Sequence, residues 1–123
     1  MQNLQTPRKA VDDLKPSELN PTDSLDIFNI TYDRVTPVFH AFASTIRLQI
    51  ILLLAQRKHY VYELVDTLGS SQPLISQHLK VLKNAGIITS VRTGRQVQYE
   101  LVTPDVTKLL DEALKLEKLL ANT

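Results

Sequence analysis

Two short helical segments joined by a glycine-containing turn restrict most strongly how this chain can fold. The first, Val61 to Leu68, has leucines at four-residue spacing, and Gly69 is placed to end it. The second runs from Ser71, a residue type that often caps a helix N-terminus, to Ala85. Two such helices with a turn between them are typical of a helix-turn-helix unit.

The residues before this unit predict two further helices. Ser44 is a suitable N-cap for a helix over residues 45–56, which is apolar nearly all round and therefore belongs at the centre of a domain. Upstream, we expect helix from residue 25 to Phe42, broken or restarted near Pro37, because proline suits the first turn of a helix. Residues 1–23 contain three prolines and many charges, so we expect a flexible N-terminal arm there.

Two runs of strand character follow the unit. Residues 87–92 are rich in β-branched side chains, and residues 96–101 alternate between polar and apolar side chains. Gly94 lies between the runs and predicts a hairpin turn, and Thr103 followed by Pro104 opens a last helix. The predicted fold class is therefore mainly α-helical with a small β-hairpin. Its order is that of a winged helix-turn-helix over residues 24–123, with the hairpin as the wing.

The second helix of the unit has one polar face without any acid. On a helical wheel its apolar and polar residues separate completely. The polar face consists of Gln72, Pro73, Ser76, Gln77, Lys80, Lys83 and Asn84. Amides, hydroxyls and amines hydrogen-bond to base edges and phosphates. An ordinary exposed helix mixes glutamate with lysine, so the absence of acid favours a polyanionic partner.

The charge of the whole chain is segregated in the same way. Residues 34–99 hold eight bases and two acids, and no acid lies between Asp66 and Glu100, whereas both ends are net acidic. The predicted wing adds Arg92, Arg95 and Gln96 to this basic middle, and wing arginines can follow a DNA backbone or enter a minor groove. Two plainer interpretations stay open, namely an uneven solvated surface and an edge strand protected by charge.

These patterns predict an interface with double-stranded DNA. Base contacts are expected from Gln72, Ser76 and Gln77, and phosphate contacts from Ser71, Lys80, Lys83, Arg92 and Arg95. The full candidate set is Ser71, Gln72, Pro73, Ser76, Gln77, Lys80, Lys83, Arg92, Arg95 and Gln96. The alternative is a winged-helix module that grips an acidic protein.

Other classes of function have no support in the sequence. The chain has no cysteine, which excludes disulfides, thiolate metal sites and cysteine nucleophiles. It carries no phosphate-binding glycine loop, zinc-hydrolase histidine pair or nucleophile elbow, so we do not expect an enzyme. The longest apolar run, residues 50–55, is far below the ~18–20 residues that cross a bilayer. With no apparent leader, we expect a cytoplasmic protein without a membrane partner.

The three histidines stand at unrelated spacings and predict no metal cluster within one chain. His78 and His40 lie among apolar residues, so we expect both in the core. His59 follows two cations at a predicted helix end, where we expect a surface cap. A metal site completed across a dimer stays open.

The last helix carries more apolar surface than one contact needs. One seam contains Val106, Leu109, Ala113, Leu116 and Leu120, and beside it lie Leu110, Leu114 and Leu119. We expect one stripe to pack on the chain's own core and the other on a partner helix.

The segment SQPLISQHLKVLKNAGII, residues 71–88, resembles the recognition helix of the ArsR/SmtB family of winged-helix repressors. The similarity extends from about Phe39 to Leu101 and is greatest to the zinc-responsive branch. It implies a homodimer built on the first and last helices, which binds an inverted repeat in promoter DNA and is released by an effector. We place that dimer interface on Phe28, Val38, Val106, Leu109, Ala113, Leu116 and Leu120.

The usual metal ligands of the family do not carry over to this sequence. The resemblance puts one ligand pair at Tyr60 and Tyr62, and a second set at Thr103, Asp105, Leu116 and Leu119. Leucine cannot bind zinc. We therefore predict no metal cofactor, and three alternatives stay open: a different effector, an unusual oxygen and histidine site, or constitutive repression.

Overall fold

The computed structural model describes residues 26–123, and the predicted arm over residues 1–23 lies outside the described residues. By its internal contacts the chain divides into residues 1–33 and residues 34–123. The proposed arm and the proposed domain over residues 24–123 stay predictions.

The first helix is shorter than predicted. Helix α1 spans Tyr32–Phe42, and residues 27–29 form a turn in place of the helix expected there. The carboxylate of Asp26 accepts the backbone N–H of Phe28 at 2.9 Å, which stabilises a turn in place of a helix. The predicted restart at Pro37 is also wrong. Pro37 lies inside α1, which loses one backbone hydrogen bond there and continues.

Helix α2, Thr45–Gln56, agrees with the predicted bounds and is in contact with the helices and the sheet that follow it in the chain. The Oγ of Ser44 accepts the backbone N–H of Arg47 at 3.3 Å, as an N-cap does. Ile50, Ile51 and Leu54 are buried, which confirms the expectation drawn from its apolar composition.

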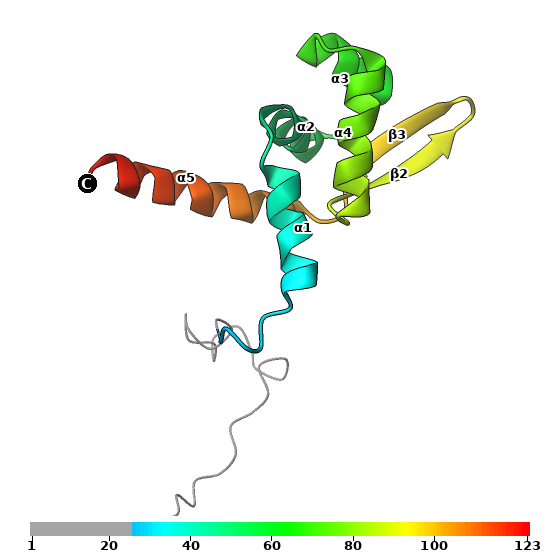
Figure 1. The fold of residues 1–123 in the computed structure, drawn as a ribbon. Helices are drawn as coiled ribbons and strands as arrows, with labels where there is room; N and C mark the ends of the chain where they lie inside the picture. The colour runs from blue at the N-terminus through cyan, green and yellow to red at the C-terminus, as the bar shows by residue number, and fades with distance from the viewer. Residues whose placement is uncertain (1–25) are drawn as a thin grey trace, which may run out of the picture. The chain divides into compact units, whose positions relative to one another are not determined.

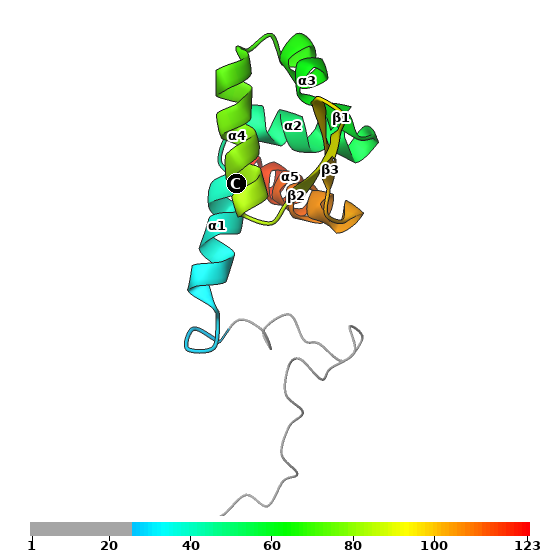
Figure 2. The same ribbon diagram turned by 90° about the vertical axis from the view of Figure 1, so that its right-hand side faces the viewer.

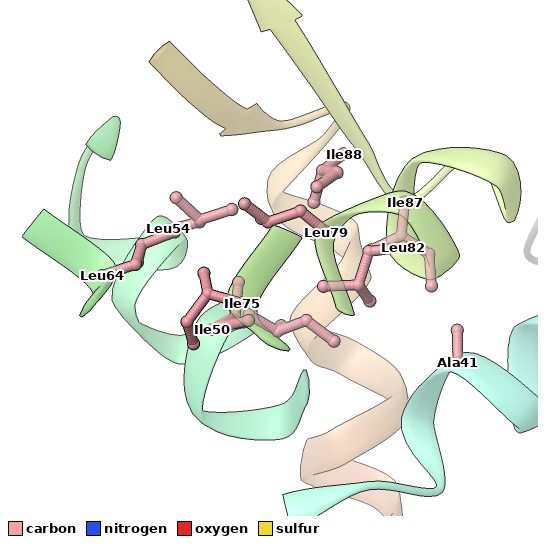
Figure 3. Packing of buried hydrophobic residues seen from close by; sticks show 10 residues of the cluster. Ala41, Ile50, Leu54, Leu64, Ile75, Leu79, Leu82, Ile87 and Ile88 are labelled. Atoms are coloured by element: carbon pink, nitrogen blue, oxygen red, sulfur yellow. The ribbon is translucent and has the colours of Figure 1, made fainter. Parts of the chain in front are cut away.

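The helix-turn-helix unit is present as helix α3, Val61–Leu68, followed by helix α4, Gln72–Asn84. The turn between them contains Gly69 at φ 65°, and Ser71 caps α4 by accepting the N–H of Leu74. Side chains from α2, α3, α4 and the following strand meet in one core, as Figure 3 shows. The labelled members include Ile50, Leu54, Leu64, Ile75, Leu79, Leu82 and Ile88.

The hairpin is part of a three-stranded antiparallel sheet in the order β1-β3-β2. Strands β2, Ile88–Thr93, and β3, Gln96–Leu101, form the predicted hairpin, and Gly94 at φ 64° lies in its turn. Figure 1 shows this hairpin projecting from the body beside α4. Strand β1, His59–Tyr60, was not predicted. It pairs with β3, and His59 is buried with 3% exposure, so its interpretation as a surface cap is wrong.

The last helix begins with one 3-10 turn. Thr103 accepts the N–H of Asp105 at 3.3 Å and caps η3, Pro104–Val106, which leads into helix α5, Thr107–Ala121. Val106 packs against the core, whereas every residue from 111 to 123 is exposed. Figure 1 shows the C-terminal half of α5 extending away from α2, and Figure 2 views the same helix nearly along its axis.

In the part of the chain that the structure describes, no single helix is long and apolar enough to cross a membrane. The pair α1 and α2, bent by 91° at its junction, reaches the required length and composition together.

Candidate nucleic-acid interface

The polar face of α4 points outward in the structure. All ten candidate residues are exposed: Ser71, Gln72, Pro73, Ser76, Gln77, Lys80 and Lys83 at α4, and Arg92, Arg95 and Gln96 on the hairpin. On the opposite side of α4, Ile75, Leu79 and Leu82 have exposures of 1% or less. Because these apolar residues lie in the core, they limit the rotation of α4 about its own axis to orientations that keep its polar face outward.

Helix and hairpin are joined by a contact that the sequence did not reveal. Lys83 donates a hydrogen bond from its Nζ to the Oγ of Ser90 on β2 at 2.7 Å. Within residues 26–123, no carboxylate forms an ion pair with Lys80, Arg92 or Arg95. As far as residues 26–123 are concerned, these three cations are therefore available to an anionic partner.

Part of the basic middle is already used inside the fold. Arg57 pairs with Glu63 at 2.8 Å, and Lys58 pairs with Glu100 at 3.4 Å. Arg47 is buried with 8% exposure. The net charge of the sequence segment therefore overstates the positive charge on the surface, and the candidate interface depends on the cations of α4 and the wing.

The two histidines expected in the core differ from each other. The Nδ1 of His78 lies 3.1 Å from Nη1 of Arg47, which gives the one expected hydrogen bond, but the residue is half-buried and so agrees only in part with a place in the core. Burial, and then the charge of Arg47, lower the pKa of His78. His40 is exposed, so its core interpretation is wrong.

A hollow between α3, α4 and the wing adds residues that the sequence analysis missed. It has a volume of about 220 Å³ and contains Tyr60 and Tyr62 beside Gln72 of α4 and Arg95 of the wing. The two tyrosine rings stack with centroids 5.6 Å apart and an interplanar angle of 8°. Tyrosine hydroxyls are common phosphate contacts, but these two residues precede the helix-turn-helix pattern, and no local signal connects them to it.

Comparison with known proteins identifies the family. The sequence profile of the bacterial regulatory proteins of the arsR family matches residues 44–90. The transcriptional regulator MJ1325 of Methanocaldococcus jannaschii is 36% identical over 85 residues, which cover 66% of this chain and 96% of that protein. This chain belongs to the ArsR/SmtB family of winged helix-turn-helix transcriptional regulators.

Other members of the family agree in sequence and fold. The transcriptional repressor SmtB of Mycobacterium tuberculosis is 40% identical over 82 residues, and the chain spans 61% of its length. The structure of Rv0081 from M. tuberculosis superposes with a TM-score of 0.66 at 32% identity, covering 74% of this chain and 93% of that one. Mb0332 of Mycobacterium bovis, a homodimeric winged helix-turn-helix DNA-binding domain, gives a TM-score of 0.63 at 32% identity, covering 71% and 82%.

The positions of the usual metal ligands in this ArsR/SmtB protein do not fit a zinc ion. Tyr60 and Tyr62 stack on each other, and Asp105 pairs with Lys108 at 3.0 Å. Leu116 and Leu119 are apolar. No group of three or more histidine, aspartate or glutamate side chains comes together among the described residues.

Proposed function

We propose that this ArsR/SmtB protein is a dimeric, sequence-specific DNA-binding repressor that acts in the cytoplasm. On this proposal it binds an inverted-repeat operator in promoter DNA and is released by an effector. The observation that carries the proposal is the exposed, acid-free face of α4, whose opposite face is anchored in the core.

In this mechanism α4 lies in the major groove. Gln77 and Gln72 offer amides that can pair in a bidentate manner with adenine, and Ser76 offers a hydroxyl between them. Lys80 and Lys83 neutralise phosphates farther along the helix. The N-terminus of α4 adds backbone N–H groups and the positive end of the helix dipole.

The wing supplies the second set of contacts. Arg92 and Arg95 are exposed on the hairpin and can follow the backbone or enter the minor groove. Tyr62 extends this surface, because its exposed side chain stands in the hollow between the wing and α4. We include Tyr62 as a backbone contact that positions the duplex without reading its sequence.

Dimerisation uses the uncovered apolar surface of α5. Leu116 and Leu120 are 54% and 62% exposed, and Leu114 and Leu119 beside them are also exposed. Val106 is partly taken up by the protomer's own core, so the outer half of α5 is the surface that a second copy covers. In such a dimer the two α4 helices meet half-sites one helical turn apart, about 34–36 Å centre to centre.

The deciding experiment is selection of binding sites from a random duplex pool. Enrichment of a palindromic sequence supports both sequence-specific binding and two-fold symmetry of the protein–DNA complex. Affinity for the enriched duplex should fall steeply as the salt concentration rises. In a plot of the logarithm of the binding constant against the logarithm of the salt concentration, each neutralised phosphate contributes a slope of about −0.9. If no sequence is enriched and the weak binding to DNA does not depend on salt concentration, the alternative of a winged-helix module that binds an acidic protein is favoured.

A further inference from the structure

The guanidinium of Arg47 joins three helices of the domain. From α2, its Nε donates to the backbone oxygen of Ala41 at 2.9 Å and its Nη2 donates to the backbone oxygen of His40 at 2.9 Å. Both carbonyls belong to the last turn of α1. The remaining arm, Nη1, lies 3.1 Å from Nδ1 of His78 on α4. Arg47 therefore links the end of α1 to the helix that carries the candidate base contacts.

The direction of the bond to His78 follows from the chemistry of arginine. A guanidinium has only N–H donors and keeps its charge, so it cannot accept a hydrogen bond. The Nδ1 of His78 must therefore be the acceptor, which requires a neutral imidazole with its proton on Nε2. The lowered pKa of His78 agrees with this neutral form.

The two parts of the contact have different consequences. The bond to Ala41 satisfies a carbonyl that the end of α1 leaves unpaired, whereas the carbonyl of His40 already accepts the N–H of Ala43 at 3.1 Å and gains a second donor. A positive charge at a helix C-terminus is also favourable. These two bonds explain why a cation stands at position 47, but they do not explain the third contact of Arg47, which is with His78. The bond to His78 is directional, unlike the packing of Ile75 and Leu79 around it, so it adds a constraint on the rotation of α4.

We propose that Arg47 is a positioning residue for DNA recognition: acting through His78, it sets the rotation of α4 so that Ser76 and Gln77 face the bases. The inference rests on the proposed function. His78 directly follows Gln77 in the helix, so an error in rotation at His78 moves Gln77 with it. Arg47 and His78 themselves do not touch the DNA.

The test replaces His78 with side chains that keep or remove the acceptor. Asparagine places its Oδ1 close to where the imidazole places Nδ1, so H78N can still accept from Arg47. H78L cannot, and it leaves one arm of the buried guanidinium unpaired. Each variant is measured for affinity to the selected duplex and to a scrambled duplex. Thermal unfolding and sedimentation establish that each variant is folded and has the same subunit number.

We expect H78L to lose roughly tenfold in affinity for the selected duplex, the size expected from one unpaired buried donor. Its affinity for scrambled DNA, which depends on charge, should stay within about twofold. H78N should restore most of the preference. The matched control is H40L, because Arg47 bonds only to the backbone oxygen of His40, and this variant should bind like the natural chain.

The direct check is the nitrogen NMR spectrum of the imidazole of His78 in the full chain. An unprotonated Nδ1 whose resonance shifts in R47M supports the link, and a protonated Nδ1 at neutral pH overturns it. If the natural chain selects a site and H78L retains the same preference, the positioning role is wrong although the proposed function stands. If the natural chain selects no site, the proposed function and the positioning role fail together, while the spectrum still decides whether the link exists.

Discussion

Lys83, near the end of α4, is hydrogen-bonded through its Nζ to the Oγ of Ser90 on β2 at a distance of 2.7 Å. This bond ties the helix to the base of the wing. The hydroxyl is neutral, so the amine keeps its full charge for a phosphate while its position is restricted. At the proposed interface Lys83 would therefore have two separable roles, one in charge and one in orientation.

Two substitutions separate these roles. K83M removes the charge, so it should weaken binding to all sequences and reduce the magnitude of the salt slope by about 1. S90A removes only the tether, so the slope should not change, although backbone relaxation of the wing should show greater mobility. Fluorescence anisotropy with a labelled duplex over a salt series measures both. K108M is the control, since Lys108 lies near η3 and pairs with Asp105.

Gln77 and Lys80 are both exposed on α4 but should behave differently. Q77A should relax specificity at one base pair by about 1–3 kcal/mol and leave the salt slope unchanged. K80A should weaken all sequences alike and flatten the slope. Competition with single-base variants of the selected duplex distinguishes the two results. If neither variant alters binding, the outer face of α4 is not the interface.

The exposed leucines of α5 predict a dimer that one charge can disrupt. L116E places a carboxylate where we expect a second copy to pack, so the dissociation constant of the dimer should rise roughly tenfold or more. Sedimentation equilibrium without DNA measures this change. V91E is a matched control, because Val91 is equally exposed but lies on the wing. Unchanged self-association of L116E would place the dimer contact elsewhere.

Stability should fall in two steps on acidification. Burial and the charge of Arg47 hold the pKa of His78 below its ordinary value of 6.5, and hydrogen bonds, first from Arg57, hold that of Glu63 below 4.5. In both cases the unfolded chain binds the proton more readily, so stability is full above each ordinary value and is lost as pH falls through the lowered one. The His78 step begins near pH 6.5 and the Glu63 step near pH 4.5.

Urea unfolding at a series of pH values measures these steps. H78N should lack the first step, and E63Q should lack the second. Greater stability at pH 5.5 than at pH 7 in the natural chain would contradict the assignment of His78.

Gly94 gives the wing its turn at φ 64°. A Cβ at this position would meet no atom within 4 Å, so the cost of substitution comes from the backbone alone. G94A should therefore destabilise the domain by about 1–2 kcal/mol, and G94N by less, because asparagine tolerates the left-handed region better than alanine. Urea unfolding gives the difference, and equal stability of all three proteins would show that the turn can change conformation at no cost.

Local patterns predicted the helices around the turn well, because their determinants lie within each segment. The cap at Ser44 and the apolar run after it defined α2, and Gly69 with Ser71 defined the helix-turn-helix. Strand β1 was missed because its two residues form a strand only through β3, where His59 pairs with Tyr99. The same dependence on distant residues explains the wrong interpretation of His59.

The outward residues of α4 also followed from periodicity, since one turn of helix relates each of them to its neighbours. The contacts that connect elements did not. Arg47 was counted with the surface charge of the sequence, yet it is buried against α1 and α4. The bond from Lys83 to Ser90 and the hollow at Tyr62 likewise join segments that no helical or strand period relates.

The uncovered end of α5 has a consequence for how gene control depends on the amount of protein. If two copies must combine before either holds DNA, then in dilute solution the binding-competent species increases with the square of the chain concentration. Halving the supply of the regulator would then reduce operator occupancy up to fourfold. On the proposed mechanism, the apolar surface that one protomer leaves exposed on α5 would thus make the response to gene dosage steeper than linear.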